Sequence, residues 1–163
     1  MGRLAPWAAI GGAVIGILSG PAAARSHEAA PARIAEAVLQ HYVLSWDHAD
    51  AQAIAGAFAH DGDFISPDGL HARGPGEIEA FYQGAFARGY AGSTGRFSPR
   101  VVRRLAPGVI AVDGEWSITG ARDAQGRPRP PESGIATAVL VEGPKGWQVG
   151  LLREQAGAKR ISP

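Results

Sequence analysis

The stretch QHYVLSWDHADAQAIAGAFAHDGDFISP, at residues 40–67, decides the fold. Apolar residues four positions apart, among them Tyr42 and Trp46, predict the buried face of a helix. Asp50 is a good N-cap for a second, shorter helix, and the closing DFISP has the composition of a short strand. The stretch therefore predicts two helices followed by a strand.

The flanking sequence extends this pattern in both directions. The first helix is expected at residues 31–48, because Pro31 suits a first helical position, and a third helix begins at Gly74. Between them, residues 70–73 can pair back on the first strand. Further strands are expected at 96–105, 109–120, 134–141 and 147–154, with a Pro-rich loop at 123–133.

This order of elements indicates an α+β fold. We expect a cone-shaped, curved antiparallel sheet that wraps around the helices and leaves a cavity between the two. Residues 134–141 are apolar on both faces of their strand. One face is therefore expected to meet the helices and the other a second subunit, which predicts a homodimer.

The N-terminal 24 residues have the pattern of a secretory signal peptide. Arg3 is the only charge before Arg25, an apolar run follows it, and Ala22 to Ala24 form an A-x-A cleavage site. The alternative is a permanent membrane anchor, since residues 4–24 carry no charge. We expect cleavage and export to the periplasm or the extracellular space. The predicted segments are a signal peptide at 1–24, a flexible leader at 25–32, one domain at 33–155 and a tail at 156–163.

Composition excludes several classes of function. The signal segment holds one of the 16 basic residues and none of the 15 acidic ones, so the exported chain has no net charge. A neutral domain has no electrostatic reason to bind nucleic acid, or a membrane after signal cleavage. The absence of cysteine excludes disulfides, a thiol nucleophile and thiolate metal sites. No nucleotide-binding or flavin-binding motif is present, so we expect no cofactor.

A set of residues spread over positions 34–154 appears in a characteristic order. The set comprises Trp46, Asp50, the run Phe58 to Gly69, Gly74, the strand Gly114 to Gly120, and Gly146-Trp147. With this set the chain resembles the nuclear-transport-factor-two-like superfamily, which has a cystatin-like α+β roll. Within it, the SnoaL-like and SgcJ/EcaC-type groups are the most similar. The resemblance implies a curved sheet, a pocket at the open end of the cone and a dimer.

The same superfamily includes the ketosteroid isomerases, whose helix-to-strand segment can be laid on residues 40–67 without a gap. The tyrosine that holds the oxyanion in those enzymes falls on Tyr42, and the aspartate that moves the proton falls on Ser66, just before Pro67. Their second oxyanion acid falls within residues 134–141, which contain no carboxylate. A serine hydroxyl cannot replace a carboxylate base, so the resemblance does not predict steroid isomerisation.

The candidate ligand-binding residues are two polar side chains, four aromatic ones and an arginine: Tyr42, Ser66, Trp46, Phe64, Phe81, Trp116 and Arg153. No catalytic residue is identified, but Tyr42 is a candidate hydrogen-bond donor to an oxyanion, and Asp63 and Asp68 are candidate bases. Each of these three residues also has a purely structural interpretation. Tyr42 is otherwise a core tyrosine, Asp63 faces away from Phe64 by strand alternation, and Asp68 shapes a turn.

Arg153 and two histidines also have both a functional and a structural interpretation. Alternation places Arg153 on the same face as Trp147 and Leu151, where it either forms a structural ion pair or anchors an anionic ligand. His60 and His71, with nearby aspartates, could in principle bind a metal. Their spacing matches no common metal motif, so we expect no metal site.

Three hypotheses of function follow from these observations. The first is an exported protein that binds a small, mostly apolar molecule in the cone pocket, with no assigned reaction. The second is a pocket enzyme, an isomerase, dehydratase or hydrolase, with Tyr42 as electrophile and Asp63 or Asp68 as base. The third is a dimeric accessory or scaffold module whose pocket is filled by side chains.

Overall fold

The computed structural model describes residues 21–157, with side chains from residue 30 onward. Most of the predicted signal peptide and of the predicted tail lies outside these residues. The N-terminal half contains α1 (Pro21–Asp47), α2 (Ala51–Gly56), β1 (Phe58–Ile65), β2 (His71–Arg73), α3 (Gly74–Ala85) and the π-helical turn η1 (Phe86–Tyr90). The C-terminal half contains the long strands β3 (Thr94–Ala106), β4 (Val109–Thr119), β5 (Glu132–Gly143) and β6 (Gly146–Ala156).

The six strands form one sheet in the order β2-β1-β6-β5-β4-β3, and the predicted α+β fold is confirmed. Every neighbouring pair is antiparallel except β1 and β6, which run parallel with Phe64 beside Leu152. The sheet is therefore mixed at that edge rather than antiparallel throughout. A parallel pair needs a long connection, and here the whole chain between β1 and β6 provides it.

The first helix begins at Pro21, ten residues before its predicted start. The segment 25–32, predicted as a flexible leader, is therefore helical, and Pro31 lies inside the helix rather than in its first turn. The sequence around it is rich in alanine, the strongest helix former. We attribute the longer helix to this local preference, which outweighs the one backbone hydrogen bond that a proline removes.

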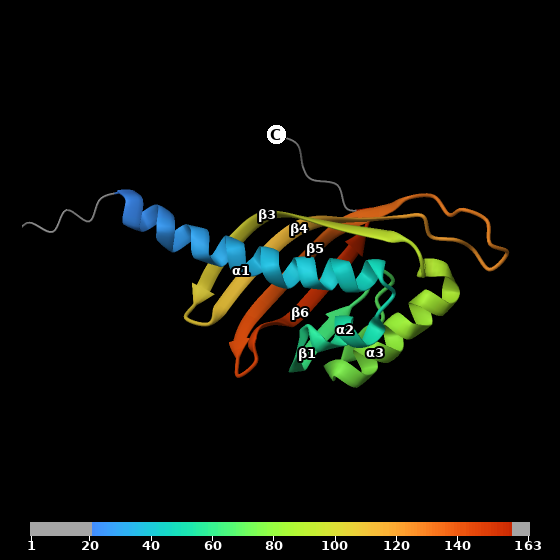
Figure 1. Ribbon diagram of the computed structural model, residues 1–163, viewed down its shortest axis with the longest axis horizontal. Coiled ribbons are helices and arrows are strands. Elements are labelled where there is room, and N and C mark those ends of the chain that lie inside the picture. The colour runs from blue at the N-terminus through green and yellow to red at the C-terminus, as the bar shows by residue number, and fades with distance from the viewer. Residues whose placement is uncertain (1–20, 158–163) are drawn as a thin grey trace, which may run out of the picture.

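The helices cover one face of the curved sheet, with α1 crossing the long strands and α2 and α3 beside β1 (Figure 1). The core lies between these two layers. Its most deeply buried members come from both layers and include Ile54, Phe64, Ile78, Tyr82, Ile110, Val112 and Leu140. Asp50 caps α2 by accepting a hydrogen bond from the Ala53 amide at 2.9 Å, as the sequence predicts. No helix within residues 21–157 combines the length and the apolar character that a membrane crossing requires.

The opposite face of the sheet is not covered by any part of the chain that the structure describes. On β5, Ala136 and Ala138 are buried against the helices, whereas Ile135 keeps 40% of its surface exposed. Ion pairs from Arg100 to Glu115 and from Arg103 to Asp113 lie across the neighbouring strands. The homodimer expected from the apolar sequence of β5 stays a prediction.

A bulge in β6 changes which of its side chains face the helices. Val149 pairs with Leu140 and Leu151 pairs with Val139, so Gly150 is the extra residue between two successive pairs. Such an insertion reverses the alternation of side chains beyond it. Val149 is buried before the bulge and Leu152 after it, so the even-numbered residues at the end of β6 point inward.

Candidate functional site

A cavity of about 740 Å³ lies between α1, α3, η1 and the inner face of the sheet. Its wall is mostly aromatic and aliphatic, with charged residues added from both ends and from the loop that precedes β5. The wall includes Tyr42, Trp46, Phe64, Ser66, Asp68, Phe81, Tyr82, Arg88, Tyr90, Arg96, Trp116, Arg129, Glu132 and Glu154. The size and the apolar lining are those of a small-molecule site.

Aromatic rings pack against one another along the helical side of the cavity. The Trp46 and Tyr82 rings meet edge to face with centroids 6.0 Å apart, and Phe64 stacks on Tyr82 at 5.5 Å. Phe81 meets the edge of Phe64 at 5.0 Å. These contacts fix the rings in place without filling the space beside them, which argues against the hypothesis of a pocket filled by side chains.

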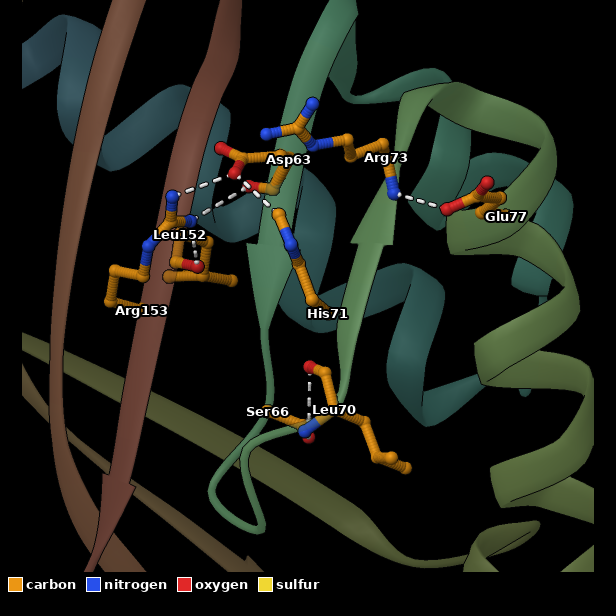
Figure 2. Close-up of polar contacts among 8 residues, drawn as sticks. All are labelled: Asp63, Ser66, Leu70, His71, Arg73, Glu77, Leu152 and Arg153. Atoms are coloured by element: carbon orange, nitrogen blue, oxygen red, sulfur yellow. Dashed lines mark hydrogen bonds and ion pairs between the residues drawn. The ribbon is translucent and has the colours of Figure 1, made fainter.

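Six of the seven predicted ligand-binding residues lie in this wall: Tyr42, Trp46, Phe64, Ser66, Phe81 and Trp116. Ser66, however, is 2% exposed, and its hydroxyl is already engaged in the turn that follows β1. It donates to the Asp68 carboxylate. It also accepts a hydrogen bond from the Leu70 amide at 3.0 Å (Figure 2). Ser66 and Asp68 thus hold this turn, the role expected for Asp68 if it shapes the turn.

The Tyr42 hydroxyl forms a hydrogen bond of 2.5 Å with the Tyr82 hydroxyl. Tyr82 is 1% exposed, whereas Tyr42 is only partly buried and lines the cavity from α1. Burial, together with the nearby Glu154 carboxylate, raises the pKa of both phenols well above the usual value. Both hydroxyls therefore keep their protons at neutral pH, and the pair can offer one of them to a ligand oxygen.

Glu154 is the acidic group that faces the aromatic wall from the sheet. Its backbone pairs with that of Ala136, a buried residue of β5. Among the described residues its carboxyl group has no hydrogen-bond or ion-pair partner, and burial alone raises its pKa from 4.5 to about 7. The residue is half-buried because its surface opens onto the cavity. A carboxyl group with a pKa near 7 can give or take a proton at neutral pH.

Arg153 and Asp63 lie outside the cavity wall, in contrast to two expectations from the sequence. The Gly150 bulge turns Arg153 outward, where it donates to the Asp63 carboxylate at 2.7 Å and to the Asp63 carbonyl at 3.3 Å. His71 contacts the same Asp63 oxygen at 2.8 Å (Figure 2). Arg153 thus forms the structural ion pair that was one of its two expected roles, and neither Arg153 nor Asp63 lines the cavity.

We predict that Asp63→Asn lowers the free energy of unfolding by about 1 to 2 kcal/mol at pH 7, because the charged hydrogen bonds that join β2, β1 and β6 are lost. Burial raises the pKa of Asp63, but the hydrogen bonds from Arg153 and His71 outweigh it and hold that pKa below its usual value. A carboxylate of lowered pKa stabilises the fold above its unfolded pKa and loses this effect as the pH falls. Urea unfolding at pH 7 and pH 3 measures both effects. An equal difference between the two proteins at both pH values would contradict this account.

No group of three or more acidic, histidine or cysteine residues within residues 30–157 is arranged to hold a metal ion. His71 points to Asp63, as described above, so the two histidines of the first hairpin are not brought together with a shared carboxylate.

Two residues of the cavity were not recognised in the sequence. Neither Tyr82 nor Glu154 was among the candidate site residues, although both line the cavity.

The chain belongs to the SnoaL-like domain family, whose sequence pattern matches residues 32–153. No curated protein matches the chain. Among solved structures, a nuclear transport factor 2-like superfamily protein from Salmonella enterica serovar Typhimurium is 20% identical with a TM-score of 0.70, covering 81% of this chain and 94% of that chain. A cystatin-like fold protein from Caulobacter vibrioides is 19% identical with a TM-score of 0.69, covering 79% and 91%. A ketosteroid isomerase-like protein from Erwinia carotovora is 18% identical with a TM-score of 0.64, covering 80% and 96%. These likenesses establish the predicted nuclear-transport-factor-two-like fold.

Proposed function

We propose that this protein is an enzyme that moves a proton on a small, mostly apolar carbonyl compound bound in the cavity. The observation that carries the proposal is Glu154, a carboxyl group with a pKa near 7 that shares an apolar cavity with a hydrogen-bonded tyrosine pair. Paired groups of this kind, with strongly shifted pKa values in a cleft, are typical of active sites. A protein that only binds an apolar molecule would gain nothing from the cost of burying this carboxyl group.

The proposed reaction uses the carboxyl group of Glu154 as a base and the hydroxyl groups of the tyrosine pair as hydrogen-bond donors. The Glu154 carboxylate removes a proton from the carbon next to the carbonyl, and the electron pair of that C–H bond moves to the carbonyl oxygen to give an enolate. The Tyr42 hydroxyl donates a hydrogen bond to this oxygen, while Tyr82 donates to Tyr42. Protonated Glu154 then returns the proton to the same carbon or to another carbon of the conjugated system. The sum is an exchange or an isomerisation that consumes no second reactant.

The apolar wall strengthens both steps. Water is displaced from the cavity by the substrate, so the hydrogen bond from Tyr42 to the enolate oxygen acts in a low-dielectric environment. The aromatic contacts among Tyr82, Trp46 and Phe64 hold the donor in position before the substrate arrives. A donor that is fixed in advance stabilises the developing charge without reorganising during the reaction.

β-Tetralone in D₂O tests the proposal, because its activated C–H bonds lie next to a carbonyl on an apolar bicyclic frame of suitable size. We expect wild-type protein to exchange these protons for deuterium faster than buffer at the same pH, as followed by proton NMR. Exchange at the buffer rate would overturn the proposal. In that case the simpler hypothesis of a binding protein would account for the cavity.

We predict that Tyr42→Phe slows this exchange by roughly 10- to 100-fold, because the enolate loses its direct donor while the ring packing is kept. Tyr90→Phe is the matched control. The Tyr90 hydroxyl already donates to Glu132 at 2.9 Å, so its removal is expected to change the rate by less than about twofold. Equal losses in the two variants would show that the cavity shape, and not the Tyr42 hydroxyl, sets the rate.

We also propose that the protein is exported and that the reaction takes place outside the cytoplasm. The charged start, apolar run and small-residue site of residues 1–24 favour export to the periplasm or the extracellular space. Because the chain contains no cysteine, its stability in an oxidising compartment does not depend on disulfide formation. A homodimer joined through the uncovered face of the sheet is compatible with the site, since the cavity lies on the other face.

A further inference from the structure

Glu154 differs from the other carboxyl groups of the cavity wall, because it has no hydrogen-bond or ion-pair partner among the described residues. The others, Asp68, Asp123 and Glu132, accept from Ser66, Arg127 and Arg129, respectively. Glu154 lies on the inner face of β6, in register with the buried Ala136 of β5. Its carboxyl group is therefore available to a charged group that a ligand brings into the cavity.

The titratable groups that interact with Glu154 are two phenols, Tyr42 from α1 and Tyr82 from α3. Both phenols are neutral at neutral pH, because burial and the Glu154 carboxylate raise their pKa values well above the usual one. No cation among the described residues lowers the pKa of Glu154, since burial alone shifts it. A phenol oxygen accepts a hydrogen bond as well as donating one, so a ligand group with several N–H donors can bind the carboxylate and a phenol together.

The rest of the cavity favours an apolar body attached to such a group. The rings of Trp46, Phe64 and Trp116 belong to the wall, and a hydrocarbon that leaves water for them gains about 25 cal/mol for each Å² that is buried. Folding has already removed the Glu154 carboxyl group from water, which is why its pKa is raised to about 7. A ligand cation therefore supplies the carboxylate with an interaction that it lost on folding, and only the cation is newly dehydrated.

We infer that the cavity binds protonated apolar amines, with the ammonium group paired to the Glu154 carboxylate and the hydrocarbon body against the aromatic wall. Charge-assisted hydrogen bonds of this kind are stronger than those between neutral groups. This class of ligand differs from the neutral carbonyl compound of the proposed reaction, because a simple amine has no activated C–H bond for Glu154 to break. The inference shares the placement of Glu154 with the proposed function but does not require its reaction.

β-Aminotetralin and β-tetralol are matched probes, because they share one bicyclic frame and carry an ammonium group and a neutral hydroxyl group, respectively. Changes in tryptophan fluorescence report their binding, since Trp46 and Trp116 line the cavity. At pH 8 the amine and Glu154 are both mostly charged, and we expect wild-type protein to bind the amine about tenfold more tightly than the alcohol. At pH 5 Glu154 is mostly protonated, and this preference is expected to fall below about twofold.

Glu154→Gln removes the charge with little change in shape. We expect its preference for the amine at pH 8 to disappear while its affinity for β-tetralol stays within about twofold of wild type. Retained binding of β-tetralol also shows that the variant still forms the cavity. Glu142→Gln is the control for the loss of one negative charge from the protein. Glu142 is exposed on β5 outside the cavity wall, so this variant is expected to keep the preference.

Equal affinities of wild-type protein for the two probes at pH 8 would overturn the inference. An unchanged preference in Glu154→Gln, or its loss in Glu142→Gln as well, would do the same. If β-tetralol binds and β-tetralone exchanges but the amine is not preferred, only this inference fails. If neither probe binds, the cavity is not a site for ligands of this size, and the proposed function fails with the inference.

Discussion

Replacing Glu154 by glutamine is expected to slow the exchange of β-tetralone protons by about 10²- to 10⁴-fold, the usual loss when a general base is removed. Glutamine has nearly the shape of glutamic acid, so the cavity keeps its form while the group that accepts the proton is lost. The comparison of wild-type and variant rates by NMR measures this effect. Glu142→Gln is the control, because Glu142 is exposed on β5 outside the cavity wall.

The pH dependence of the reaction follows from the same group. Burial raises the pKa of Glu154 to about 7, so the carboxylate form that accepts the proton accumulates as the pH rises through 7. The rate is therefore expected to increase as the pH rises through about 7, where half of the groups are ionised, and to level off above it. A rate in the Glu154→Gln variant close to that of wild type, or a plateau already reached near pH 5, would contradict the role of Glu154.

The stability of the protein responds to this group in the opposite direction. Between pH 4.5 and about 7 the folded chain keeps the Glu154 proton that the unfolded chain has lost. The contribution of this group to stability is thus fully present below the unfolded pKa and is lost as the pH rises through the folded one. Glu154→Gln removes this dependence, so the variant gains stability relative to wild type as the pH rises.

The second large effect is expected from Gly134→Ala, which we predict to lower the free energy of unfolding by about 3 kcal/mol. A Cβ atom at this position would lie 1.8 Å from the Gln155 carbonyl oxygen and 2.8 Å from the Trp116 ring. The first of these contacts is with backbone, which cannot move away as a flexible side chain does. The strands β5 and β6 must separate locally, at the end of β6 that holds Glu154.

Gly56→Ala is the matched control for this substitution. A Cβ atom on Gly56 would meet no other atom within 4 Å, and the residue lies at the end of the short helix α2. Alanine is a better helix former than glycine, so the control is expected to be neutral or slightly stabilising. Thermal or urea unfolding of both variants measures the difference. If both variants are as stable as wild type, the close approach of β5 and β6 is not as described.

Much of the fold could be predicted from sequence because it depends on local patterns. The apolar face of α1, the Asp50 cap and the alternation of β4 were each visible in the residues themselves. The parallel pairing of β1 with β6 was not, since it depends on contacts between residues far apart in the chain. The early start of α1 was missed because Pro31 was interpreted as a first helical residue.

The residues of the cavity could be predicted from the sequence only in part. Tyr42 was predicted because its helix has a clear apolar face, yet its partner Tyr82 lies 40 positions away and was recognised only as a core residue. Glu154 was missed for a single reason. Strict alternation along β6 places Arg153 inside and Glu154 outside, and the bulge at Gly150 exchanges the two. A glycine in a strand is a signal for a bulge, and it is the one feature that could have corrected the prediction.

The claim on which the function depends is that the bulge places an uncompensated Glu154 carboxyl group inside an apolar cavity. The most direct test is a titration of the Glu154 side-chain carboxyl carbon by NMR, with Glu154→Gln used to assign the signal. We expect a pKa of about 7 in the folded protein. A pKa near 4.5, the ordinary value for glutamate, would show that the group faces water and would contradict both the geometry and the proposed reaction.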